Sequence, residues 1–181
     1  KLESDSSLGL VHCDYQEVDA DSKPFGSTYV FPNEGHVLDE LLLLDERTSF
    51  FNLGGCLLRM EVFKHTGGFD PELSNCADHE FLFRVAKLCR IGRAPHLGLY
   101  YRIHSNNMHS NIKLLEKDLI AAYRKADENG LFDGSVFRRR CYGNMYFVLA
   151  GCWWNDEGDK WRGGKYLLRS IAVYPPTILR L

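Results

Sequence analysis

The chain has 181 residues, which suits one domain or slightly more, and 45% of them are hydrophobic, which is enough for a packed core and excludes wholesale disorder. Its formal net charge of −2 produces no strong field that would attract nucleic acid or an anionic membrane, so we expect no nucleic-acid partner.

The first part of the chain, residues 1–110, mixes strand and helix patterns. Runs of alternating or continuous apolar residues indicate strands, and apolar residues at helical spacing indicate helices. Glycine pairs and a polar turn separate these runs. In chain order, the sequence predicts a strand at 8–18, a turn at 19–24, a short helix at 37–45, a buried strand at 50–59, a short helix at 60–65, a helix at 78–89 and an extended segment at 91–102, which Pro95 and Gly98 interrupt.

The second part, residues 111–181, contains helical patterns alone. Its three predicted helices span 112–129, 136–154 and 160–173, and the Tyr174-Pro175-Pro176 sequence stops the last of them. We therefore predict an α/β part at 1–110 followed by an all-helical extension at 111–181.

No apolar run approaches the roughly 18 residues that a membrane-spanning helix needs, and we expect no signal peptide. Because the chain begins at Lys1 rather than at Met, we expect an excised piece of a longer protein. The six cysteines form neither a CxxC pair nor a Cys/His cluster with zinc-finger spacing. We expect buried free thiols in a reducing compartment.

Two carboxylates, Asp78 and Glu80, stand at the start of the helix predicted at 78–89. A carboxylate at this position is stabilised by the helix dipole, so a role for Asp78 in capping the helix is one explanation. The functional hypothesis is a general base that lies at the rim of a pocket and deprotonates a hydroxyl nucleophile. Glu80 falls on a different face of the helix, so the two carboxylates need not share one role.

Glycine pairs occur at two places. Gly54-Gly55 interrupts an apolar strand pattern, which indicates either a bulge or the close approach of a sugar or diphosphate to the backbone. The sequence Gly67-Gly68-Phe69-Asp70 is explained by a helix stop followed by an anchored aromatic ring.

His104 follows the extended segment and precedes a loop rich in Ser and Asn. It is either an ordinary surface or core histidine, or a residue that ligates a divalent metal or touches a diphosphate, and His109 is close enough to be confused with it. Arg102 either binds a phosphate or forms an ordinary salt bridge.

Two further clusters have simple structural explanations. Asp19-Ala20-Asp21 has the spacing of a DxD metal motif, but it lies in a polar turn, and we interpret it as a solvated hairpin turn. The three arginines at 138–140 cannot all face one surface, so a solvated face is one explanation and contact with an anionic membrane or a lipid-phosphate acceptor is another. Trp153-Trp154 either packs between helices or lies at an interface.

Taken in order, these motifs resemble the C-terminal half of family 2 glycosyltransferases, which have the GT-A fold. The resemblance covers residues 1–110, and the helical extension is only loosely similar to the variable C-terminal helices of that family. Three segments are similar to the region just after the family's metal-binding DxD: Lys1-Leu2-Glu3, Leu8 to Asp14 and Asp19-Ala20-Asp21. The other matching segments are Gly54-Gly55 through Arg59, similar to its acceptor-side strand; Gly67-Gly68-Phe69-Asp70, similar to its GGFD turn; Ala77-Asp78-His79-Glu80-Phe81, similar to its base motif; and Tyr101-Arg102-Ile103-His104, similar to its YRxH end.

The resemblance implies inverting transfer of a sugar from a nucleotide-diphosphate sugar to a hydroxyl of a glycan or lipid-linked acceptor, as in polysaccharide biosynthesis. It implies a cytoplasmic protein, with the inner face of the membrane as an alternative location. It also implies a Mg²⁺ or Mn²⁺ ion at the leaving diphosphate. The residues it assigns are Asp78 as the catalytic base, Gly54, Gly55, Glu80 and Arg102 as substrate-binding candidates, and His104 near the metal or diphosphate.

The chain departs from the family pattern in two ways. Ala77 stands where the family has Glu, and the nucleotide-binding half with its DxD motif is absent. We therefore expect little or no transferase activity from this chain alone, and open sheet edges that favour a homo-oligomer. The alternatives are a non-catalytic binding or scaffold module and, with less support, a hydrolase that uses Asp78 and Glu80 as paired carboxylates.

Overall fold

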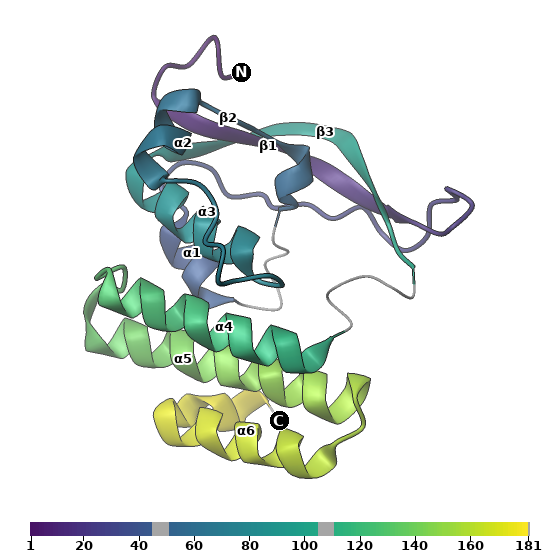
Figure 1. The fold of residues 1–181 in the computed structure, drawn as a ribbon, viewed down its shortest axis with the longest axis vertical. Helices are drawn as coiled ribbons and strands as arrows, with labels where there is room; N and C mark the ends of the chain where they lie inside the picture. Colours follow the sequence, from purple (N-terminus) through teal and green to yellow (C-terminus); the bar gives the residue numbers. More distant parts are fainter. Residues whose placement is uncertain (45–50, 105–110, 181) are drawn as a thin grey trace. The chain divides into compact units, whose positions relative to one another are not determined.

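The computed structural model of the chain describes residues 1–44, 51–104 and 111–180. It is a mixed α/β structure with a small three-stranded sheet (Figure 1). The described residues form two compact units. We call residues 1–41, 51–69 and 81–104 the sheet unit, and residues 42–44, 70–80 and 111–180 the helical unit.

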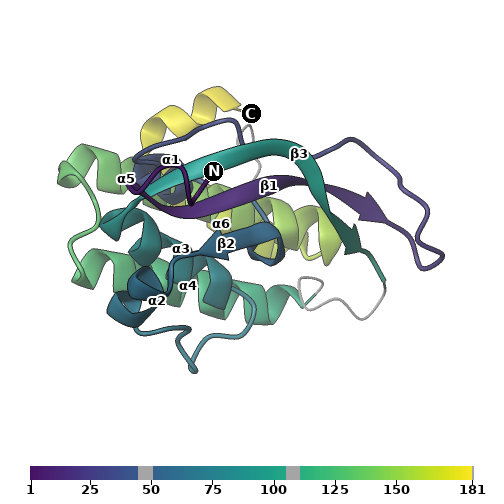
Figure 2. The same cartoon turned by 90° about the horizontal axis from the view of Figure 1, so that it is seen from above.

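The sheet has the strand order β2-β1-β3 (Figure 2). Its strands are β1 (Leu8–Val18), β2 (Cys56–Leu58) and β3 (Arg90–Arg102). β1 runs parallel to β3 and antiparallel to β2. The first five residues of β1 are buried without a break, and buried and half-buried residues alternate over the rest of the strand. The predicted strand at 8–18 and the extended segment at 91–102 are thus confirmed.

The pairing of β1 with β3 shifts register near the predicted interruptions. Cys13 pairs with Ala94 and the next residue, Asp14, pairs with Leu97, so β3 has extra residues between these pairs, beginning with Pro95. Proline has no backbone N–H to donate, and a bulge accommodates it inside a strand pair.

The short helix α2 (Met60–Thr66) ends as the sequence predicts. Gly67 adopts a left-handed conformation with φ of 78°, which a residue with a Cβ rarely adopts. The guanidinium of Arg84, on α3 (Ala77–Leu88), donates a hydrogen bond to the carbonyl of Gly68 at 2.7 Å. The ring of Phe69 lies 4.7 Å from that of Phe81, so the aromatic ring of this turn is anchored as expected.

The predicted strand at 50–59 is wrong over its first residues. Leu53–Gly55 form a short 3-10 helix, and β2 begins only at Cys56. The side-chain Oδ1 of Asn52 accepts the backbone N–H of Gly54 at 2.8 Å, and this local cap turns the chain away from the strand path. Phe50 lies outside the described residues. The helix predicted at 37–45 is found as α1 (Leu38–Leu43), and Asp45 lies outside the described residues.

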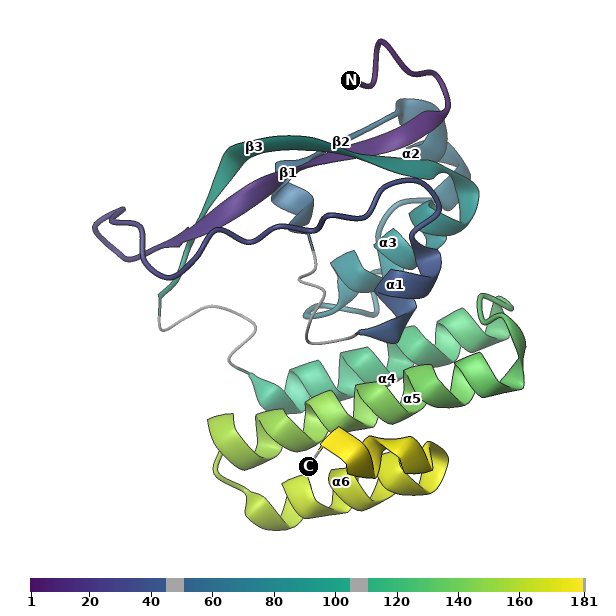
Figure 3. The same ribbon diagram turned by 180° about the vertical axis from the view of Figure 1, so that it is seen from behind.

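The helical unit contains the three helices predicted from the sequence (Figure 3). They are α4 (Ile112–Glu128), α5 (Gly134–Gly151) and α6 (Lys160–Val173). α5 continues into a π-helical turn at Cys152–Asp156, and a 3-10 helix at Pro175–Arg180 follows α6.

Small residues bring α5 and α6 close together. A Cβ added to Gly163 would lie 3.0 Å from the carbonyl oxygen of Ala150, and one added to Gly143 would lie 2.6 Å from the Cβ of Tyr174. The buried hydroxyl of Ser170 donates to the carbonyl of Gly143 at 2.6 Å. Side chains at these glycines would separate the two helices.

The cysteines of the chain are all free, as the sequence predicts, but only Cys76 and Cys141 are fully buried and the other four are half-buried. Within the described residues, no helix combines the length and apolar character that crossing a bilayer requires.

Candidate functional site

Asp78 lies in the first turn of α3, where its side chain is exposed to solvent. The backbone N–H of His79 donates to Asp78 Oδ1 at 2.8 Å. The carboxylate of Asp78 therefore lies at the N-terminal end of α3. A general base must reach the proton that it removes, and the exposed carboxylate of Asp78 is accessible to a substrate hydroxyl.

The loop that precedes Asp78 is held by a buried carboxylate on α4. Asp118 has no exposed surface, and its Oδ2 accepts the backbone N–H groups of Ser74 and Asn75, each at 2.7 Å. Hydrogen bonds to an ionised acceptor are the stronger kind, and two of them on one oxygen fix the path of the backbone. Asp118 therefore positions the start of α3.

A second contact anchors the same segment to α4. The ammonium of Lys125 contacts the carboxylates of Asp70 and Glu72, the latter at 3.2 Å. The hydrogen bond from Lys125 to Asp70 is the main reason that the pKa of Lys125 is raised, and the bond to Glu72 acts in the same direction. Segment 70–80 is thus tied to α4 at both its beginning and its middle.

Two titratable neighbours of Asp78, His79 and Cys76, stay uncharged near neutral pH. Burial lowers the pKa of His79, and the negative charge of Asp78 acts in the opposite direction. Burial also raises the pKa of the Cys76 thiol, and the charges of Asp78 and Asp118 add to that effect. Neither neighbour therefore adds an anion beside Asp78.

Glu80 lies in a different environment from Asp78. Only 5% of its surface is exposed, whereas the side chain of Asp78 faces solvent. Two carboxylates that act together on a substrate must both reach it. The structure therefore gives no support to the hydrolase alternative.

The glycine pair of the sheet unit has a packing explanation. A Cβ added to Gly55 would lie 2.8 Å from the sulfur of Cys13, closer than real atoms come. Gly54 is exposed, and a Cβ there would lie 3.1 Å from Asn52 Oδ1. The close contact with Cys13 thus explains why position 55 is a glycine. Gly54 is the member of the pair whose backbone a ligand can approach.

Arg102 holds the turn that follows β1. Its guanidinium donates to the carbonyls of Asp19 at 3.0 Å and Ala20 at 2.6 Å, and to the hydroxyl of Ser22 at 2.8 Å. Asp19 Oδ1 in turn accepts the backbone N–H groups of Asp21 and Lys23, each at 2.9 Å. The interpretation of the Asp19-x-Asp21 sequence as a hairpin turn is confirmed.

Among the described residues, no group of side chains is already arranged to hold the divalent metal that the resemblance implies. No group of three His, Cys, Asp or Glu side chains within residues 1–44, 51–104 and 111–180 is arranged to ligate an ion. His104 is exposed, Asp19 is engaged by backbone N–H groups, and His109 lies outside the described residues. The divalent metal therefore stays a prediction, and the proposed reaction assigns no step to it.

The candidate residues fall into two groups. Asp78 and Glu80 belong to the helical unit, and Gly54, Gly55, Arg102 and His104 belong to the sheet unit.

Sequence reasoning missed the positioning role of Asp118. The signal was an acidic residue on the apolar stripe that Leu115, Leu119 and Ala122 form at helical spacing. A buried Asp at such a position needs hydrogen-bond partners, which the sequence does not identify.

A comparison with known proteins found no protein-family model and no curated protein that matches this chain.

Proposed function

We propose that this chain is the acceptor-side part of a glycosyltransferase that resembles family 2 and has the GT-A fold, with Asp78 as its general base. The observation that carries the proposal is the exposed Asp78 carboxylate on a segment that Asp118 and Lys125 tie to α4. A carboxylate that is fixed at the start of a helix can be held within hydrogen-bond reach of an acceptor hydroxyl. The order of the sequence motifs supports the fold assignment.

In the proposed reaction, Asp78 takes the proton of an acceptor hydroxyl as that oxygen forms a bond to the anomeric carbon of the donor sugar. The bond between this carbon and the diphosphate oxygen breaks, and its electron pair leaves with the diphosphate. Attack from the opposite face inverts the configuration. Asp118 and Lys125 act as positioning residues, because they hold the segment that carries Asp78 and do not contact the reacting atoms.

The alternative is a non-catalytic binding or scaffold module. The specific observation in its favour is that two of the candidate substrate-binding residues have structural partners: Gly55 packs against Cys13, and Arg102 holds the turn after β1. A module of this kind binds a glycan or a partner without turnover.

Two experiments separate these functions. Extending the reading frame upstream of Lys1 shows whether a nucleotide-binding half with a DxD motif is encoded there, and its absence removes the enzyme proposal. The extended protein is then assayed against a panel of nucleotide sugars. Turnover of any of them supports the glycosyltransferase, and acceptor binding without turnover supports the module.

A further inference from the structure

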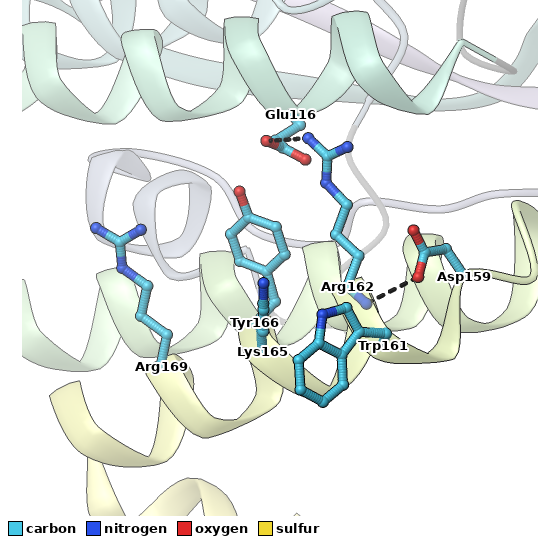
Figure 4. A pocket seen from close by; sticks show the side chains of 7 residues that line it. All are labelled: Glu116, Asp159, Trp161, Arg162, Lys165, Tyr166 and Arg169. Atoms are coloured by element: carbon cyan, nitrogen blue, oxygen red, sulfur yellow. Dashed lines mark hydrogen bonds and ion pairs between the residues drawn. The ribbon is translucent and has the colours of Figure 1, made fainter.

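A cavity of about 410 Å³ opens beside α6 in the helical unit (Figure 4). Its walls come from α4, from the turn before α6 and from one face of α6. Three cations line it: Arg162, Lys165 and Arg169. Their spacing of three and four residues places them on one side of the helix.

Both carboxylates of the cavity are engaged by protein groups. Glu116 accepts a hydrogen bond from the indole N–H of Trp153 at 2.6 Å and one from the guanidinium of Arg162 at 2.9 Å. Asp159 caps α6 by accepting the backbone N–H of Arg162 at 2.9 Å. The guanidinium of Arg162 also lies 3.9 Å from the ring centroid of Trp153. The charges of Arg162 and Glu116 therefore offset each other, and the two side chains form a fixed wall of the cavity.

The other two cations face solvent, and the partners found for them within residues 1–44, 51–104 and 111–180 are aromatic rings. The ammonium of Lys165 lies 5.1 Å from the ring centroid of Trp161, and the guanidinium of Arg169 lies 4.5 Å from that of Tyr146. Throughout the part of the chain that the structure describes, neither cation has a carboxylate within ion-pair distance. Two neighbouring cations without a counter-charge attract an anion.

The aromatic residues of the cavity are also compatible with the binding of an anion. Burial raises the pKa of Tyr166 to about 12, and its hydrogen bond to Glu116 acts in the same direction. Tyr166 is therefore neutral at physiological pH and introduces no negative charge. Trp161 is 76% exposed at the edge of the cavity, where its ring offers an apolar face to the organic part of a ligand.

We propose that this cavity binds the phosphoryl group of an organic phosphate, with Lys165 and Arg169 as the phosphate contacts and Trp161 against the rest of the ligand. Arginine and lysine are the side chains that proteins use most often for phosphate. The phosphoryl group belongs either to a soluble phosphate ester or to a lipid headgroup, and the chemistry of recognition is the same. This proposal does not depend on the glycosyltransferase proposal.

The test titrates the whole 181-residue chain with inorganic pyrophosphate at constant ionic strength, with tryptophan fluorescence and calorimetry as readouts. The double variant Lys165→Gln/Arg169→Gln removes both charges and leaves a polar side chain at each position. We expect its affinity to fall about tenfold or more, since two charge-assisted contacts are lost. The matched control is Lys113→Gln/Arg140→Gln, which removes two exposed charges of the same unit outside the cavity. Its affinity should stay within twofold of the wild type, and equal thermal midpoints show that both variants fold.

A second arm uses co-sedimentation with vesicles of phosphatidylcholine that contain phosphatidylglycerol. Saturable binding of pyrophosphate that the cavity variant loses and the control keeps supports a soluble phosphate. Binding of vesicles alone, with the same difference between variants, supports a lipid headgroup. The proposal is overturned if neither probe binds, or if the cavity variant and the control lose binding equally, because a general charge effect would then explain the result.

Discussion

Removal of the Asp118 carboxylate is the sharpest test of how segment 70–80 is held. The structure gives this carboxylate two backbone hydrogen bonds of 2.7 Å, from Ser74 and Asn75, in a fully buried site. Hydrogen bonds to charged groups each contribute roughly 1.5–3 kcal/mol, and water can replace part of that at the exposed Ser74. We expect Asp118→Ala to lower the free energy of unfolding by about 2–4 kcal/mol.

The conservative variant Asp118→Asn should be affected less. Its amide oxygen can still accept both N–H groups, and its amide nitrogen would replace Oδ1, which has no hydrogen-bond partner among the described residues. The free energy of unfolding then falls by about 1–2 kcal/mol, mainly because the charge is removed.

The assay is urea unfolding followed by circular dichroism. A loss of 2–4 kcal/mol lowers the midpoint by roughly 1–2 M, because small proteins lose about 1–3 kcal/mol of stability per molar urea. The control is Glu128→Ala on the same helix, whose exposed ion pair with Arg124 should contribute less than about 0.5 kcal/mol. Equal unfolding free energies for Asp118→Ala and Glu128→Ala would refute the anchoring role of Asp118.

Two further predictions concern the sheet unit. His12 is buried, its ring stacks on that of Phe51 at 4.4 Å, and burial lowers its pKa below 6.5. The unfolded chain therefore binds the proton first, so the stabilisation is complete above pH 6.5 and is lost progressively as the pH falls below it. The variant His12→Phe keeps the ring packing and should show a smaller loss of unfolding free energy between pH 6.5 and 5 than the wild type; identical pH slopes would contradict this. The second prediction is that Gly55→Ala lowers the unfolding free energy by about 1–3 kcal/mol, since its Cβ would meet Cys13, whereas Gly54→Ala changes it by less. Thermal or urea unfolding measures both glycine variants, and a larger loss in Gly54→Ala would show that the packing explanation is wrong.

The secondary structure was largely predictable because its signals are local. Apolar periodicity located β1, α3 and the three helices of the helical unit, and a glycine with positive φ marked the end of α2. The prediction of a strand at 50–59 was wrong over its first residues because a single side chain, that of Asn52, caps the Leu53–Gly55 turn. That signal is also local, but an apolar run with a strand pattern obscured it.

The contacts that organise the site were not predictable, because they join residues far apart in the sequence. Asp118 reaches back 43 and 44 residues to hold the loop before α3, and Arg102 reaches back 82 and 83 residues to the turn after β1. Composition and periodicity carry no information about such pairs. The same limit applies to the pairing of Glu116 with Arg162 beside the α6 cavity.

The central claim is that Asp78 is the base of a sugar-transfer reaction, and the most direct measurement is the turnover of Asp78→Asn in the protein extended to include a nucleotide-binding half. We predict a loss of ~10²–10⁴-fold in kcat with unchanged affinity for the nucleotide sugar, because the amide cannot accept the proton. The matched control is Glu61→Gln, which changes another exposed acid in the first turn of a helix, and it should keep wild-type turnover. Near-normal turnover in Asp78→Asn would contradict the assignment.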